Sequence, residues 1–224
     1  KANKFDGINI VSIFVNPTQF NNKKDLNKYP RNINRDLKIL KKLKVDFVFI
    51  PNTKIIYNFK HSKKIKINPK YKVMCAKFRK GHFEGVLDVM DRFLRIIKAK
   101  YVFMGEKDYQ QFYMIKKYLS KKHKTNIINC KTVRDKNNVA LSTRNNLISK
   151  KQYSKLVKLI NEFSKLKKKL IFNKQFSNLN NKEIIKKIEN KYKIRIDYIE
   201  IRDEKNLKIP KSNKNLRIFY AFWL

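Results

Sequence analysis

Residues 101–111 read YVFMGEKDYQQ, and this stretch decides the fold class of the 224-residue chain. The apolar residues 101–104 predict a strand, and Gly105 ends it. A helix is predicted to begin near Asp108 and to reach about residue 122. A strand, a short turn and a helix in this order are typical of a parallel sheet that is covered by helices.

The same alternation continues along the N-terminal half of the chain. Strands are predicted at 8–15, 45–50 and 126–130, and helices at 35–43 and 85–98. The run at 8–15 is rich in β-branched and aromatic residues, which predicts a strand buried on both faces, and 45–50 predicts a second buried strand. Residues 54–74 predict only short strands and a loop. Together these elements predict an α/β fold with a parallel, helix-covered sheet.

A different pattern begins at about residue 132. Helices are predicted near 149–169 and 182–191, and alternating strands at 194–201 and 216–224. These elements predict a smaller α+β unit. We therefore expect two domains, an α/β domain at 1–131 and a smaller C-terminal domain at 132–224.

Composition excludes several classes of protein. The chain is 42% hydrophobic and 12% aromatic, which is enough for a core and excludes intrinsic disorder. No apolar run approaches the roughly 18 residues of a membrane span. Cys75 and Cys130 lie far apart and form no Cys-x-x-Cys motif, which excludes a zinc knuckle or a disulfide framework. No apolar signal peptide opens the chain, so we expect a cytoplasmic protein.

The formal net charge of +39 invites a nucleic-acid-binding interpretation. The charge is spread evenly along the chain, however, and 46 Lys far outnumber 10 Arg, although Arg is the better fork for phosphates and base edges. Lys, Asn and Ile are all abundant and all have A/T-rich codons. We therefore favour codon bias on a solvated surface over a dedicated nucleic-acid site.

The turn at 105–108 is the clearest candidate site. Ligands of doubly wound sheets bind at the carboxyl ends of strands, beside helix N-termini. Gly105 would let a ligand approach the backbone, Lys107 can pair with phosphate oxygens, and Asp108 can accept hydrogen bonds from ribose hydroxyls. The alternative is a plain turn in which Asp108 caps the helix.

Three other segments carry polar groups suited to a site. Gln19 follows the first strand and suits a hydroxy acid, although 16–19 also reads as a strand-ending turn. Gln111 lies one helical turn beyond Asp108. The loop at 141–144 joins two hydroxyls and a guanidinium, which suits a polyphosphate, or it is a helix-capping loop with a solvated Arg. The basic turn at 79–83 either orients an anion or is a surface turn with an incidental His82.

Nine stretches together resemble the pantothenate synthetase family, the pantoate–β-alanine ligases of the nucleotidyltransferase superfamily. They are VSIFVNPTQF (11–20), DLNKYPR (25–31), VDFVFIP (45–51), KGHFEGV (80–86), GEKDYQQ (105–111), TVRD (132–135), ALSTRN (140–145), IEIRD (199–203) and AFWL (221–224). The resemblance implies a Rossmann-like N-terminal domain that lacks its first strand and helix, a smaller C-terminal domain that closes over the nucleotide, and a homodimer.

The resemblance also implies a two-step reaction. ATP and pantoate give pantoyl adenylate and pyrophosphate, and the amine of β-alanine then attacks the acyl carbon, releasing pantothenate and AMP. Gln19 and Gln111 would hold pantoate, and Gln19 would also lie beside β-alanine. The implied ATP contacts are Gly105, Glu106, Lys107, Asp108, Val133, Leu141, Ser142, Thr143 and Arg144. Lys107 and Arg144 would be the catalytic cations, and Mg²⁺ would bridge the phosphates without a protein ligand.

Three features depart from the family pattern. The signature His-x-Gly-His, which binds ATP and includes the assigned general acid, is expected upstream of Val11, and no His precedes His61. Thr143 stands where Ser is usual and keeps the hydroxyl. The charge is more basic than usual. Two alternatives stay open: a catalytically lapsed remnant of the enzyme, and a basic nucleic-acid-binding protein descended from it.

Overall fold

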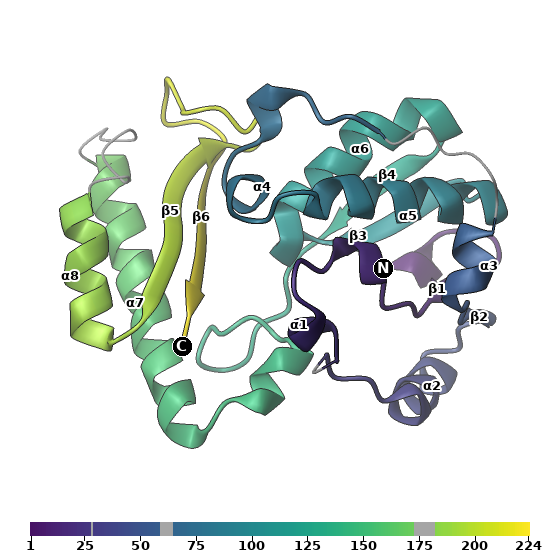
Figure 1. The fold of residues 1–224 in the computed structure, drawn as a ribbon, viewed down its shortest axis with the longest axis horizontal. Coiled ribbons are helices and arrows are strands. Elements are labelled where there is room, and N and C mark those ends of the chain that lie inside the picture. Colours follow the sequence, from purple (N-terminus) through teal and green to yellow (C-terminus); the bar gives the residue numbers. More distant parts are fainter. Residues whose placement is uncertain (28, 59–64, 173–181) are drawn as a thin grey trace. The chain divides into compact units, whose positions relative to one another are not determined.

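The computed structural model describes residues 1–27, 29–58, 65–172 and 182–224 (Figure 1). The chain forms two compact units. The first consists of Lys1–Ile67 and Arg79–Thr132, and the second of Asn68–Phe78 and Val133–Leu224.

The first unit contains two parallel strand pairs, at the places that the sequence predicts. Strand β1 (Ile10–Ser12) pairs with β2 (Phe47–Phe49), and β3 (Tyr101–Gly105) pairs with β4 (Asn126–Cys130). Among the described residues these pairs are separate two-stranded sheets. The parallel direction of both pairs confirms the α/β class, although no ladder joins them into one sheet.

The predicted burial of the strands at 8–15 and 45–50 is wrong. Ile10 is 42% exposed and Phe47 is 60% exposed. Phe49 contacts Phe93, with ring centroids 5.9 Å apart, so the pair is covered in part. A strand is buried on both faces only when helices or neighbouring strands cover it, and the described residues around β1 and β2 leave these two side chains uncovered.

Helices separate these strands. The helical segments of the first unit are η1 (Ala2–Lys4), η2 (Pro17–Gln19), α1 (Lys23–Asn27), α2 (Ile33–Lys42), α3 (Thr53–Tyr57), α5 (His82–Ile96), η4 (Glu106–Asp108) and α6 (Tyr109–His123). Helix α3 corrects the expectation of short strands at 54–74. The Asn52 side chain accepts a hydrogen bond from the Ile55 N–H at 2.8 Å and so caps this helix. The part of that stretch at 59–64 lies outside the described residues.

The core of the first unit lies largely between α5 and α6, which pack against each other. Its fully buried side chains include Val86 and Leu87 of α5 and Met114, Ile115 and Leu119 of α6. This packing fixes the start of α6, and therefore the turn between β3 and α6, relative to α5.

The second unit is an antiparallel strand pair with two helices on one side (Figure 1). Strand β5 (Arg195–Asp203) pairs with β6 (Leu216–Trp223), and α7 (Lys150–Phe172) and α8 (Lys182–Tyr192) cover them. The remaining helical segment of residues 133–224 in the described part is η5 (Thr143–Leu147). These elements confirm the smaller α+β unit.

The segment 68–78 belongs to the second unit, whereas the expected domain division puts it in the first. It contains η3 (Pro69–Tyr71) and α4 (Cys75–Phe78). The Cys75 sulfur lies 2.9 Å from the Tyr198 hydroxyl, and the rings of Phe78 and Tyr198 stack with centroids 5.8 Å apart. These contacts with β5 decide its place, and sequence position does not reveal them. The functional division at 131/132 stays a prediction.

Candidate active site

The turn between β3 and α6 presents two exposed charged side chains. Lys107 and Asp108 are exposed, and Asp108 occupies the N-cap position of α6 without making a side-chain capping hydrogen bond. A helix N-terminus attracts anions through its free N–H groups. The interpretation of Asp108 as a mere cap is therefore disfavoured, because its carboxylate is not used by the helix.

Gly105 ends β3 in an ordinary extended conformation, with φ −69°. A Cβ atom added there would meet no heavy atom within 4 Å. The fold itself therefore does not require glycine at this position. Open space beside the backbone is what a closely approaching ligand needs.

Glu106 is held by a residue that sequence reasoning missed. Asn129 of β4 donates a hydrogen bond from Nδ2 to Glu106 Oε2 at 3.2 Å. The Oδ1 atom of Asn129 is buried and has no hydrogen-bond partner among the described residues. The carboxyl ends of neighbouring parallel strands share one edge of a sheet, and that rule could have drawn attention to Asn129.

The loop at 16–19 is locked by Asn16, which is 2% exposed. Its Nδ2 donates to the Gly85 carbonyl at 3.2 Å. Its Oδ1 accepts hydrogen bonds from the Thr18 N–H at 3.2 Å and from the Tyr57 hydroxyl at 2.6 Å. The buried Asn16 amide thus forms hydrogen bonds within the loop and to helices α3 and α5. Sequence reasoning treated Asn16 only as the end of a strand.

Gly85 brings helix α5 into backbone contact with this loop. A Cβ atom added to Gly85 would lie 2.7 Å from the Thr18 carbonyl oxygen. Any larger residue at this position would push the loop and the helix apart. The scarcity of glycine in the chain, with 4 in 224 residues, is the sequence signal that could have identified it.

His82, the first residue of α5, holds the backbone of Gln19. Its Nδ1 lies 2.8 Å from the Gln19 carbonyl oxygen, and Arg79 Nη2 donates to the same oxygen at 3.4 Å. Burial lowers the pKa of His82 to about 4, with the charge of Arg79 also lowering it, while the Gln19 carbonyl and the charge of Asp108 oppose the shift. His82 is therefore neutral at pH 7, and Nδ1–H donates. The interpretation of His82 as incidental is wrong.

Asp108 of the turn at 105–108 acts electrostatically on His82, and this turn and the loop at 16–19 both belong to the first unit. Gln111 is half-buried in the first turn of α6. His82 thus interacts with both predicted segments, with the Gln19 carbonyl through a hydrogen bond and with Asp108 electrostatically.

The predicted residues of the second unit lie on one hairpin, residues 133–144. Its two arms meet at a bridge between Arg134 and Ala140, and Leu141 N–H donates to the Val133 carbonyl at 3.0 Å. Ser142 caps η5 by accepting a hydrogen bond from the Arg144 N–H at 3.3 Å. The capping interpretation is therefore correct for Ser142. Capping leaves the exposed side chains of Thr143 and Arg144 on the solvent side of the loop.

The described residues hold no group of three or more His, Cys, Asp or Glu side chains that could bind a metal ion. Their helices also include none that combines the length and apolar character needed to cross a membrane.

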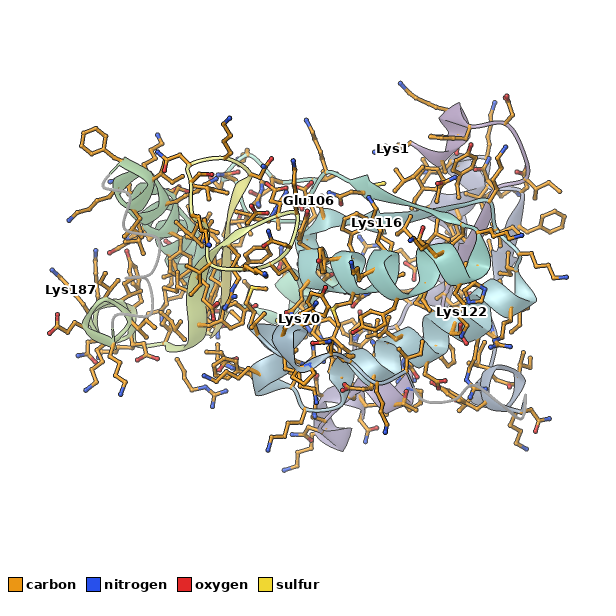
Figure 2. All side chains as sticks on the ribbon, turned by 90° about the horizontal axis from the view of Figure 1, so that it is seen from above. Lys1, Lys70, Glu106, Lys116, Lys122 and Lys187 are labelled. Atoms are coloured by element: carbon orange, nitrogen blue, oxygen red, sulfur yellow. The ribbon has the colours of Figure 1, made fainter. Side chains whose placement is uncertain are left out.

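The lysines are distributed over many elements. Lys1, Lys70, Lys116 and Lys187 are all exposed and lie on the N-terminus, η3, α6 and α8 (Figure 2). Lys122 instead pairs with the buried Asp91, at 2.6 Å between Nζ and Oδ1. The positive charge is therefore not confined to the candidate site.

Comparison with known proteins identifies relatives over the full length of the chain. The family model described as pantoate-beta-alanine ligase matches residues 1–224. The pantothenate synthetase of Pseudothermotoga lettingae is 34% identical over 227 residues, which cover 100% of this chain and 80% of that protein. The pantothenate synthetase of Leptospira interrogans is 40% identical over 195 residues, covering 86% and 68%.

Solved structures agree with these matches. The pantoate-beta-alanine ligase of Francisella tularensis, solved in complex with beta-gamma ATP and beta-alanine, is 34% identical, with a TM-score of 0.78 over 99% of this chain and 77% of that chain. A pantothenate synthetase of Thermus thermophilus, 23% identical, shares the fold with a TM-score of 0.80 over 96% of this chain and 79% of that chain. The chain therefore belongs to the pantoate–β-alanine ligase family.

Proposed function

We propose that this protein joins pantoate to β-alanine at the expense of ATP. The pantoate carboxylate attacks the α-phosphorus of ATP and displaces pyrophosphate, which gives pantoyl adenylate. The β-alanine amine then attacks the acyl carbon, the bond to AMP breaks, and one proton leaves the new amide nitrogen. The observation that carries the proposal is the exposure of Lys107 and Asp108 at the carboxyl end of β3, in a chain that matches the ligase family from end to end.

The first step has to bring two anions together. Lys107 and Arg144 would reduce the repulsion between the carboxylate and the phosphates, and holding the reactants close supplies much of the catalysis in reactions of this kind. Asp108 would accept hydrogen bonds from the ribose. The remaining proposed ATP contacts are Gly105, Glu106, Val133, Leu141, Ser142 and Thr143.

Gln19 would hold pantoate together with Gln111 and would also lie beside β-alanine. The support comes from the hydrogen bonds of Gln19 itself. The Gln19 backbone carbonyl accepts hydrogen bonds from His82 and Arg79, and the Gln19 Oε1 atom lies 3.5 Å from Asn16 Nδ2. An amide oxygen turned toward Asn16 leaves the amide NH₂ to donate to a carboxylate or hydroxyl of the substrate.

The nucleotide substrate would be the magnesium complex of ATP. Mg²⁺ usually keeps several waters and is bound through substrate phosphates and one or two carboxylates. We also propose a cytoplasmic homodimer, on the family resemblance. Light scattering coupled to size-exclusion chromatography measures the mass, and a monomer at micromolar concentration would contradict the dimer.

The activity is tested with the purified full-length protein, MgATP, pantoate and β-alanine. We expect pyrophosphate release that requires pantoate, and pantothenate and AMP that appear only when β-alanine is added. The measurements are a coupled pyrophosphate assay and mass spectrometry of the products. A folded protein, by circular dichroism, that forms neither product would support the lapsed-remnant alternative instead.

A further inference from the structure

We propose that Asp135 and Tyr153 are positioning residues that hold the 133–144 hairpin, and with it Ser142 and Arg144, in place on helix α7. The inference rests on the proposed function, because it assigns these two residues a role in presenting the ATP-binding groups. Neither residue is among the proposed contacts to a substrate.

Asp135 closes the turn of the hairpin. Its Oδ1 accepts hydrogen bonds from the N–H groups of Asn137 at 2.9 Å and Val139 at 3.0 Å. Its own N–H donates to the Val139 carbonyl at 2.9 Å, and its carbonyl accepts from the Asn138 N–H at 3.0 Å. Asn138 has φ 64°, a left-handed conformation that Asn tolerates better than most residues. One carboxylate oxygen therefore accepts two N–H groups of this turn.

Tyr153 fastens this turn to α7. Its hydroxyl donates to Asp135 Oδ2 and accepts a hydrogen bond from Asn137 Nδ2 at 3.1 Å. The bond from Tyr153 holds the pKa of Asp135 below its usual value, so the acceptor is charged at neutral pH and the hydrogen bond is of the stronger, charge-assisted kind. The single hydroxyl therefore contacts two residues of the turn, Asp135 and Asn137.

The base of the hairpin, by which we mean its turn at 135–139, is also held by apolar packing and by a second hydrogen bond. Val139 is 2% exposed and packs with Leu156 and Ile160 of α7. Arg134 Nη1 donates to the Asn138 carbonyl at 2.9 Å, and Tyr220 of β6 packs against the same apolar cluster as Val139. The base is thus attached to both the helix and the strand of the second unit.

The end of the hairpin has less support of its own. Val133 is 66% exposed and Leu141 is 55% exposed. Asn145 Nδ2 donates to the Ala140 carbonyl at 3.0 Å, and this hydrogen bond connects the segment after Ser142 to the hairpin. A tilt at the base would move the Arg144 side chain by far more than it moves Val139, and misplacement by about 1 Å can cost on the order of 100-fold in rate.

The test compares Tyr153→Phe with Tyr192→Phe in the full-length protein. Tyr192 is a matched control, because its hydroxyl also donates to a carboxylate of the second unit, Glu162, which lies away from the hairpin. We expect Tyr153→Phe to lower the rate of pantoate-dependent pyrophosphate release by about tenfold or more and to raise the KM for ATP, with the KM for pantoate unchanged. Tyr192→Phe should remain within about twofold of the wild type in every parameter.

The readout separates positioning from general loss of structure. Melting temperatures are measured for both variants, and hydrogen exchange of the 133–144 peptide should accelerate only in Tyr153→Phe. A Tyr153→Phe variant with normal kinetics would overturn the inference while leaving the proposed function intact, as would equal losses in both variants. An inactive wild type would overturn the proposed function and this inference together.

Discussion

Two of the regions that carry predicted site residues are built in different ways. The loop at 16–19 is embedded in the first unit, with Asn16 2% exposed and helix α5 in backbone contact at Gly85. The 133–144 hairpin of the second unit is exposed along much of its length and is attached at its base by the Asp135 carboxylate. The first region is enclosed by close packing around the buried Asn16 amide, whereas the second is held at its turn by the Asp135 carboxylate and the buried Val139. Substitutions in the first should therefore change stability and binding together, and substitutions in the second should change function with less effect on the fold.

The largest expected effect comes from Lys107→Ala, which removes a charge from the exposed turn at 105–108 of the first unit. We expect adenylate formation to fall by at least about 100-fold, because the proposed catalytic charge is lost. The melting temperature should stay unchanged, because Lys107 is exposed. Pyrophosphate release with pantoate and ATP measures the effect. The control is Lys117→Ala, an exposed lysine of α6, which should keep wild-type activity. Near-normal AMP release from Lys107→Ala would contradict the assignment.

Gly85→Ala tests the packing directly. In an ordinary helix interior this change stabilises by about 1 kcal/mol. Here the new Cβ would lie 2.7 Å from the Thr18 carbonyl oxygen, so we expect the free energy of unfolding to fall by about 1–3 kcal/mol and the KM for pantoate to rise. Urea unfolding and steady-state kinetics measure the two effects. A more stable variant with normal pantoate affinity would show that the loop is not held by close packing.

The pH dependence of the free energy of unfolding tests whether the buried His82 stabilises the first of the two regions. The pKa of His82 is lowered to about 4 in the folded protein, so the unfolded chain binds a proton between its ordinary value of 6.5 and about 4 that the native protein does not. Stability from this residue is full above pH 6.5 and falls as the pH falls, by about 2 kcal/mol between pH 7 and pH 5.

The measurement is urea unfolding at both pH values for the wild type and for His82→Gln, whose amide can still donate to the Gln19 carbonyl. The variant should lose less stability than the wild type on acidification. If both lose the same amount, the titration of His82 does not contribute, and the loop is held by other groups.

The smallest expected effect belongs to Asp108→Asn, because Asn keeps the shape and an acceptor oxygen. The KM for ATP should rise a few-fold, with kcat little changed, since ribose binding is weakened more than the chemistry at phosphorus. Initial rates over a range of ATP concentrations measure this. An unchanged ATP dependence would place the ribose elsewhere.

Much of the fold was predictable because its signals are local. The strand at 101–104, the turn at 105–108 and the following helix are decided by apolar runs and turn residues within a few positions of one another. The same holds for α7, α8, β5 and β6. The predicted roles of Lys107, Asp108 and Arg144 were available from their segments, and the exposure of these side chains is compatible with those roles.

The contributions of Asn16, Gly85, His82 and Asn129 were not predictable in the same way. Each acts on a partner that is distant in sequence, as when His82 holds the carbonyl of Gln19 from 63 residues away. An asparagine after a strand or a histidine in a basic turn has many possible environments, and only the fold selects one.

The sequence by itself determined the order and type of most elements, the family and the segments that carry the predicted site, because periodicity, turn chemistry and short motifs act over a few residues. The tertiary structure alone decided that Ile10 and Phe47 stay exposed, that 68–78 joins the second unit, and that Asp135 is fastened to Tyr153. Burial and hydrogen bonding depend on which distant segments meet, and that is a property of the folded chain rather than of any stretch within it.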